Sequence, residues 1–228
     1  MTDATFHVGF LLFPNITQLD MTGPFEVLSR MPGAKVDVIW KRHETVISDT
    51  GLSVLPTATF DEITSLDLIC VPGGPGVGAL LEDKQTLTFL RRIAPTARYI
   101  TSVCTGALVL GAAGLLKGKR ATTHWMSHDL LAPFGAIPVQ QRVVQDGNVI
   151  TGGGVTAGID LALSVVAAVA GESTARQVQL AIEYDPKPPF DSGSPNSAGA
   201  ELVARTREAA AARQIERAAL VARAAALM

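Results

Sequence analysis

The sequence predicts an α/β fold, a flavodoxin-like three-layer sandwich in which helices cover both faces of a mostly parallel sheet. Three short runs, residues 7–13, 66–71 and 99–103, are almost wholly apolar, as expected of strands that are buried on both faces. Segments compatible with helices alternate with these runs, which is the pattern of a parallel sheet with crossover helices. Ligands bind such sheets at the carboxyl ends of the strands, so we expect a functional site at that edge.

The remaining elements follow in chain order. They are a loop leading into a helix over 18–30, a strand over 36–40, a hairpin or pair of edge strands over 45–55, helices over 84–94 and 105–116, a short helix over 124–131, strands over 139–144 and 149–150, and helices over 156–170 and 172–184. Asp146-Gly147 joins the two late strands and is a strong hairpin signal.

The chain ends in a long helix. Residues 185–196 hold four prolines among polar residues and predict a surface connection to an alanine-rich helix over about 198–227. Its apolar side chains form a patchy stripe, which we expect to pack on the body of the protein or on a second copy. The stripe consists of Leu202, Ala209, Ile215, Leu220 and Leu227. We interpret residues 1–228 as a single domain, because this length suits one large domain.

Composition excludes several classes of partner. Nineteen basic and 21 acidic residues leave no charge excess to attract nucleic acid or an anionic membrane. The N-terminus lacks a basic signal-peptide region, and no apolar stretch approaches the ~20 residues that span a bilayer. Two cysteines cannot form a disulfide framework, so we expect both to be reduced. The sequence therefore predicts a soluble cytoplasmic protein whose partner is a small neutral ligand or another protein.

Cys104 is the first candidate for chemistry. It stands between the strand over 99–103 and a helix rich in small residues, which predicts a nucleophile elbow, a sharp strand-to-helix turn. Unpaired N–H groups and the dipole of a helix N-terminus favour a thiolate, so we expect a lowered pKa for Cys104. The alternative is a buried structural cysteine, and position alone does not separate the two. Cys70 lies in the middle of an apolar strand and is interpreted as inert packing.

The Pro72-Gly73-Gly74 loop follows the neighbouring strand. Backbone amides in this loop can complete an oxyanion site together with the amide of Thr105. Gly74, Gly76 and Ala79 also fit a relaxed dinucleotide fingerprint, but the acid expected at the end of a following strand is missing, which weakens that interpretation.

Asp20 is a candidate acid just after the first strand, among apolar neighbours. Beside a thiolate in a dry pocket, desolvation and like charge would raise its pKa and keep it protonated as a proton donor. The alternative role is the cap of a helix N-terminus. The sequence leaves both roles open.

His124 and His128 are spaced one helical turn apart, as metal-binding pairs can be. No third ligand has suitable spacing, so we do not predict a zinc site. His124 lies near the expected edge of the sheet and is a candidate for the pocket wall.

Four segments together resemble the isocyanide hydratase family. They are Ser102-Val-Cys-Thr-Gly106, Val71-Pro-Gly-Gly74, Ala121-Thr-Thr-His-Trp125 and Gln18-Leu-Asp-Met-Thr-Gly-Pro24. That family belongs to the cysteine superfamily of class I glutamine amidotransferases, intracellular-protease-like proteins and the Parkinson-disease deglycase. The resemblance covers nearly the whole chain. Two residues narrow the resemblance to hydratase-like members of this superfamily. They are Asp20 and Thr105, which stands where several members have histidine.

The resemblance implies residue roles and a reaction. Cys104 would be the nucleophile, Asp20 the acid near it and Thr105 a hydrogen-bonding neighbour, with the Gly74 amide in the pocket. The implied reaction adds water to an isocyanide and gives an N-substituted formamide through a covalent thioimidate. No cofactor or metal is implied, and the implied assembly is a homodimer.

Other activities fit less well. Glutamine amidotransfer needs a His-x-Glu late in the chain, and no histidine follows His128. A protease or deglycase of the superfamily usually has glutamate where Asp20 stands. The alternative of another class is a non-enzymatic ligand- or redox-sensing protein, because transcription regulators share the Val-Cys-Thr-Gly and Ala-Thr-Thr-His-Trp segments. This chain shows neither a helix-turn-helix pair nor a basic patch in its sequence.

Overall fold

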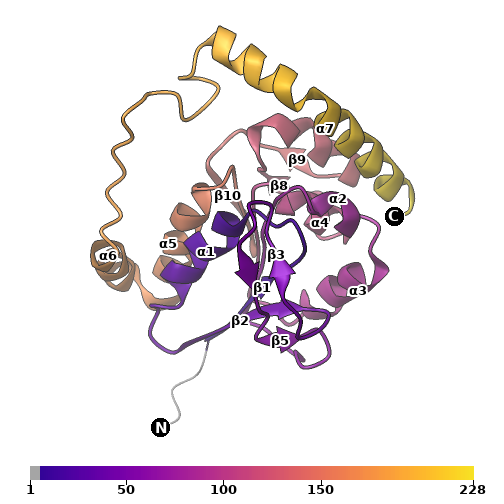
Figure 1. The fold of residues 1–228 in the computed structure, drawn as a ribbon. Helices are drawn as coiled ribbons and strands as arrows, with labels where there is room; N and C mark the ends of the chain where they lie inside the picture. Colours follow the sequence, from indigo (N-terminus) through magenta and orange to yellow (C-terminus); the bar gives the residue numbers. More distant parts are fainter. Residues whose placement is uncertain (1–5) are drawn as a thin grey trace.

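The computed structural model describes residues 6–228 and contains a seven-stranded sheet with helices on both sides (Figure 1). The strand order is β10-β11-β7-β6-β1-β2-β5. The strands are β1 (Phe6–Leu11), β2 (Ala34–Trp40), β5 (Ala58–Thr59), β6 (Leu68–Val71), β7 (Tyr99–Val103), β10 (Val143–Asp146) and β11 (Val149–Gly152). All neighbours pair in parallel except β10 and β11, which form the predicted hairpin. The predicted α/β fold with a mostly parallel sheet is therefore confirmed.

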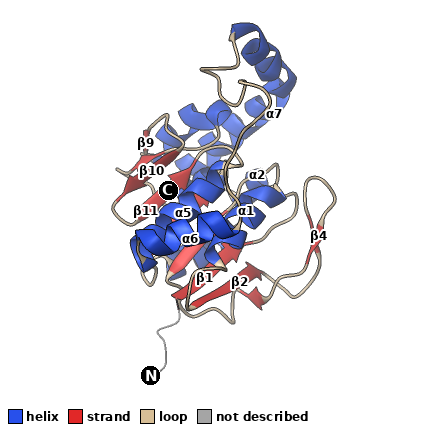
Figure 2. Cartoon of the chain, turned by 90° about the vertical axis from the view of Figure 1, so that its left-hand side faces the viewer, coloured by secondary structure: helices blue, strands red, loops and turns tan. Residues whose placement is uncertain are grey.

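Helices form the two outer layers. One layer holds α1 (Gln18–Leu28), α5 (Ala157–Ala170) and α6 (Glu172–Ala181), and the other holds α2 (Val77–Leu80), α3 (Lys84–Ile93) and α4 (Gly106–Ala112). Figure 2 shows α1, α5 and α6 lying over the sheet, with α7 (Ala200–Ala226) beyond them. α7 contacts α2, α4 and the 3₁₀ helix η1 (Trp125–Phe134). Within residues 6–228, none of the helices has the length and apolar character needed to cross a membrane.

The central strands are apolar on both faces because helices cover both faces. All four residues of β6 are inaccessible to solvent, Cys70 among them. Burial also raises the pKa of the Cys70 thiol to about 12, so this cysteine stays protonated. Its surroundings are those expected of inert packing.

α1 differs from the prediction at its N-terminus. The helix begins at Gln18, its N-cap is Thr17, and Pro24 lies in its interior instead of near its first turn. Proline has no N–H, so the Asp20 carbonyl lacks the helical donor that residue 24 would otherwise provide. Asp20 itself lies in the first turn of α1 and not in a preceding loop.

Some of the short strands and helices were not predicted from the sequence. The hairpin of β3 (Val46–Ile47) and β4 (Ser53–Val54) was expected. The elements β5, α2, β8 (Arg120–Ala121) and β9 (Ile137–Pro138) were not. Each has only two to four residues, which is too short for hydrophobic periodicity to reveal it.

α7 packs on the body of the protein, but mostly through residues other than the predicted stripe. Of that stripe, Leu220 is partly buried and packs against the core, whereas Leu202 is 45%, Ile215 73% and Leu227 80% exposed. The buried face consists of Ala210, Arg217, Val221 and Ala224. Ala210 and Ala224 allow the helix to approach the body closely there, so the buried face consists of small side chains, Val221 and one arginine.

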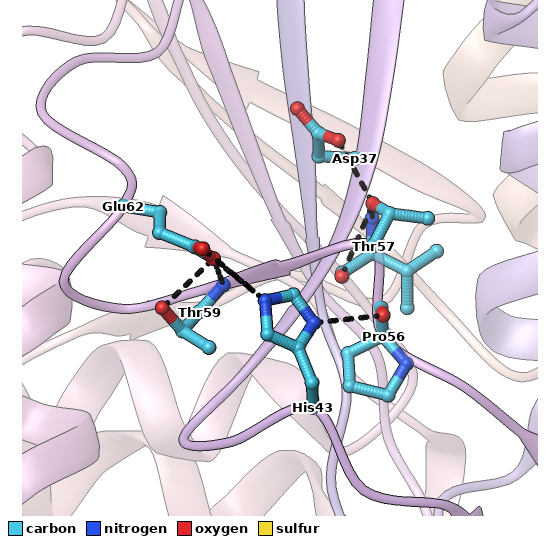
Figure 3. Close-up of polar contacts among 7 residues, drawn as sticks. Asp37, His43, Pro56, Thr57, Thr59 and Glu62 are labelled. Atoms are coloured by element: carbon cyan, nitrogen blue, oxygen red, sulfur yellow. Dashed lines mark hydrogen bonds and ion pairs between the residues drawn. The ribbon is translucent and has the colours of Figure 1, made fainter.

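Side chains fix the segment that leads from β2 past β5 (Figure 3). The Thr57 hydroxyl donates to Asp37 Oδ1 at 2.8 Å. Glu62 Oε2 accepts from the backbone N–H of Thr59 at 2.7 Å and lies 2.9 Å from His43 Nε2. These contacts hold the edge of the sheet in place.

Asp37 also connects β2 to β1. Its Oδ2 lies 2.7 Å from His7 Nε2 and 3.0 Å from Lys35 Nζ. Burial acts to raise the pKa of Asp37, but hydrogen bonds from His7, Thr57 and Lys35 outweigh it and hold the pKa below its usual range. The carboxylate therefore stabilises the fold above the unfolded-state pKa, and this contribution disappears as the pH falls through the folded-state pKa.

We expect Asp37→Ala to lower the free energy of unfolding at pH 7 by about 1–2 kcal/mol, because a hydrogen-bonded carboxylate is lost. Asp37→Asn keeps an acceptor for Thr57 and should cost less. Urea unfolding at a series of pH values measures both. The difference between wild type and Asp37→Ala should shrink in acid, and a difference that grows as the pH falls would contradict this account.

Candidate active site

Cys104 occupies the turn between β7 and α4. Its φ is 56°, a left-handed conformation that residues with side chains seldom adopt. The turn is held by its backbone: the Cys104 N–H donates to the carbonyls of Gly152 at 3.1 Å and Gly153 at 2.8 Å. The Cys104 carbonyl accepts from the Thr123 hydroxyl at 2.7 Å. The structure thus contains the sharp strand-to-helix turn that the sequence predicted, and surrounding contacts hold its strained backbone in place.

Two glycines let neighbouring segments approach this turn. A Cβ at Gly106 would lie 2.0 Å from the Val71 carbonyl oxygen. A Cβ at Gly73 would lie 2.6 Å from Thr105 N and 2.9 Å from Asp20 Oδ2. A side chain therefore does not fit at either position. The close contact brings the β7–α4 turn, the loop after β6 and the first turn of α1 to one point.

Asp20 is fully buried at this point, with 0% exposure. Its Oδ2 accepts from the Gly73 N–H at 3.0 Å. Its Oδ1 is buried and has no hydrogen-bond partner within residues 6–228. The side chain makes no N-cap hydrogen bond, because Thr17 stands at the N-cap of α1. Since Oδ2 already accepts from Gly73, we expect the proton of a neutral Asp20 to lie on Oδ1.

Burial dominates the ionisation of both groups. It raises the pKa of Asp20 to about 7, although Gly73 and the Cys104 thiol act to lower it. It raises the pKa of Cys104 to about 12, and the charge of Asp20 adds to this rise. The predicted lowering of the thiol pKa is therefore wrong. Cys104 is only 7% exposed and α4 has only seven residues, so desolvation of the thiolate outweighs what the helix N-terminus contributes.

Thr105 connects the glycine loop to the sulfur. Its backbone N–H and its hydroxyl both act to lower the pKa of Cys104. Its Oγ1 also accepts from the Gly74 N–H at 3.1 Å. Gly74 is thus at the site, but its N–H is engaged with Thr105 and is not a free oxyanion donor, which corrects the role expected for it. Gly74 instead orients the hydroxyl that faces the sulfur.

A cavity of about 210 Å³ lies over Cys104. Of the residues predicted for the site, Gly74, Thr105 and His124 line it together with Cys104. The other lining residues are Thr17, Asp49, Pro75, Met126, Val155, Arg213, Gln214 and Arg217. The sequence prediction missed this second group because local motifs do not reveal which distant segments close over a turn.

Three of the cavity-lining residues that were not predicted from the sequence belong to α7. Arg213, Gln214 and Arg217 reach the cavity from a helix that begins nearly one hundred residues after Cys104. The sequence held one signal: two arginines four positions apart, which lie on one face of a helix.

The two histidines do not form a metal site. Burial, together with the positive charges of Arg217 and Arg213, lowers the pKa of His124 to about 4, so its ring is neutral at physiological pH. His128 Nε2 lies 3.0 Å from the Thr123 carbonyl. In the part of the chain from residue 6 onward, no three His, Cys, Asp or Glu side chains are grouped to hold a metal ion.

The fold and the cysteine turn define the class of protein. The chain belongs to the DJ-1/PfpI family, whose model matches residues 7–168. Within this class, the chain is 59% identical over 204 residues to isonitrile hydratase from Pseudomonas putida, with 90% of each chain covered. Isonitrile is another name for isocyanide, so the resemblance noted in the sequence is confirmed.

Two further relatives help to place the chain. A crystal structure of a ThiJ/PfpI family protein from Pseudomonas syringae matches with a TM-score of 0.93 and 44% identity, covering 96% of this chain and 91% of that one. The HTH-type transcriptional regulator GbdR of Pseudomonas aeruginosa is 28% identical over 183 residues. That match covers 77% of this chain but only 48% of the regulator. The chain therefore resembles a regulator over only about half of the regulator's length.

We expect the Asp20 charge to be one reason why Cys104 stays protonated. Asp20→Asn removes that charge and keeps an acceptor for the Gly73 N–H, so the Cys104 pKa should fall by about one unit or more. Ultraviolet thiolate absorbance followed against pH measures this, each protein being compared with the same protein carrying Cys104→Ala. Wild-type Cys104 should ionise only at strongly alkaline pH. A midpoint that is unchanged or higher in Asp20→Asn would contradict the account.

Proposed function

We propose that this protein is an isonitrile hydratase, which converts an isonitrile and water into an N-substituted formamide. The observation that carries the proposal is the 59% identity to the Pseudomonas putida isonitrile hydratase over 90% of both chains. The structure supports it with a thiol and a carboxyl that are buried in one site. Cys104 is the proposed nucleophile, Asp20 the proposed proton carrier and Thr105 a hydrogen-bonding neighbour of the sulfur.

The first half of the proposed reaction forms a covalent thioimidate. With a thiol on Cys104 and a carboxylate on Asp20, the pair holds one proton. Asp20 accepts this proton as the sulfur attacks the terminal carbon of the isonitrile and a carbon–sulfur bond forms. The carbon then carries an electron pair, to which Asp20 returns the proton. The product of this half is a thioimidate with one new carbon–hydrogen bond.

The second half releases the formamide. Asp20 is again a carboxylate. It accepts a proton from a water molecule as the water oxygen adds to the thioimidate carbon, and it passes that proton to the nitrogen. The new hydroxyl then loses its proton as the carbon–sulfur bond breaks and the carbonyl forms. That proton returns to the sulfur through Asp20. Water has been added to the isonitrile, and both residues are back in their starting states.

A sensing role is the alternative. It is supported by the similarity to the regulator GbdR. Burial of an ionisable Asp20 beside the thiol favours the enzyme, because a pKa near 7 suits a group that must both accept and donate a proton. A sensor would bind isonitriles without releasing formamide.

We further propose that residues 1–228 act as one domain in a cytoplasmic homodimer. The proposal of a dimer is based on the resemblance to the family. The side chains of Leu180 and Ile215 are exposed and offer apolar surface for contact with a second copy. The cytoplasmic location is supported by two free cysteines, Cys70 and Cys104.

We expect the wild-type protein to convert an aryl or alkyl isonitrile into the formamide, followed by chromatography. Cys104→Ala should lower kcat/KM by at least about 10³-fold, because the nucleophile is lost. Asp20→Asn should lower it by about 10²–10⁴-fold, the usual contribution of general acid–base catalysis. Cys70→Ala is the matched control and should remain active. Full activity in Cys104→Ala would contradict the proposal, as would binding without turnover in the wild type.

A further inference from the structure

A buried arginine faces the active-site cavity. Arg217 of α7 is 8% exposed and lines the cavity together with Cys104. Its Nη1 donates to the Ser127 hydroxyl at 3.3 Å. Arg213, one turn earlier on the same face of the helix, lines the cavity as well. Two guanidinium groups thus face the space above the nucleophile.

Neither arginine has an acidic partner. No ion pair within residues 6–228 includes Arg213 or Arg217, whereas Arg223 of the same helix pairs with Glu82 at 2.9 Å. Asp49 also lines the cavity, but its Oδ2 accepts from the Thr17 hydroxyl at 2.7 Å. A buried charge is costly unless it is paired, so Arg217 lacks the partner that would offset its burial.

The missing partner has a definite chemistry. A guanidinium binds a carboxylate through two parallel N–H···O hydrogen bonds, better than it binds a neutral group. A ligand that brings a carboxylate would therefore complete the site. The cavity of about 210 Å³ lies below the range of about 300–1,000 Å³ that is typical of drug-sized ligands, so the ligand is small.

We propose that Arg217 and Arg213 form an anion subsite and that the preferred substrates are small isonitriles carrying a carboxylate. The isonitrile carbon lies at Cys104 and the carboxylate at the arginines of α7. This inference rests on the proposed hydratase activity and adds the substrate class. α7 thus determines specificity, and Arg217 is a substrate-binding residue outside the sequence motifs.

The test compares each acid with its uncharged ester. For the full-length wild type, kcat/KM is measured with isocyanoacetate and methyl isocyanoacetate, and with 4-isocyanobutanoate and its methyl ester. We expect at least one acid to be preferred over its ester by about tenfold or more, as for a desolvated charge pair. Arg217→Gln should abolish the preference through a higher KM for the acid, with a smaller loss for the ester. Arg217→Lys should keep part of it.

The controls separate binding from folding. Arg205→Gln removes the same charge from an exposed position of α7 outside the cavity and should leave the acid-to-ester ratio unchanged. If Arg217→Gln does not fold, Arg213→Gln replaces it, because Arg213 is exposed. Equal kcat/KM for acids and esters in the wild type would overturn the proposal. An equal loss for both in Arg217→Gln would do the same, because it would assign Arg217 to the chemistry.

A binding measurement distinguishes failure of this inference from failure of the hydratase activity. Calorimetric titration of the Cys104→Ala protein with N-formylglycine and with its methyl ester needs no turnover. Tighter binding of the acid, lost in the double variant with Arg217→Gln, supports the anion subsite even if no isonitrile is hydrated. Equal binding of acid and ester overturns the subsite, whatever the turnover assay shows.

Discussion

The burial of the Asp20 carboxyl beside the Cys104 thiol is the constraint on which the site depends. Both groups are nearly or fully inaccessible to solvent, and no ion pair among the described residues includes Asp20. Desolvation of an ion costs several kcal/mol, so two negative charges at this point are strongly disfavoured. One proton must therefore remain in the pair at physiological pH. The proposed addition of water to an isonitrile uses a proton that moves between this sulfur and this carboxyl oxygen.

The rest of the fold creates this buried contact. The parallel sheet places the ends of β1, β6 and β7 side by side, so the segments that follow them meet. Gly73 and Gly106 remove the side chains that would keep these segments apart. The backbone hydrogen bonds of Cys104 to Gly152 and Gly153 hold a strained residue that would otherwise relax. α7 then covers the opening and brings polar side chains to a cavity that the sheet alone would leave open.

Much of this arrangement could be predicted from the sequence, because it depends on local patterns. Apolar runs located β1, β6 and β7, and parallel topology placed Asp20, Gly74 and Cys104 at one edge. The direction of the Cys104 pKa could not be predicted, because desolvation depends on packing by residues far away in the chain. The engaged N–H of Gly74 depends on a rotamer of Thr105. The position of Arg217 in the cavity wall could not be predicted either. The sequence suggested that α7 buries its large apolar side chains, whereas the structure buries small side chains and an arginine.

The most direct test of the central claim is the ionisation of Asp20 itself. Carbon-13 NMR of aspartate carboxyls, with the Asp20 signal assigned by its absence in Asp20→Asn, measures its titration midpoint in the folded protein. We expect a midpoint of about 7, far above that of an exposed aspartate, with the shift arising from burial. A midpoint near 4, the ordinary value for an aspartate, would show that Asp20 is solvated and cannot carry the proton.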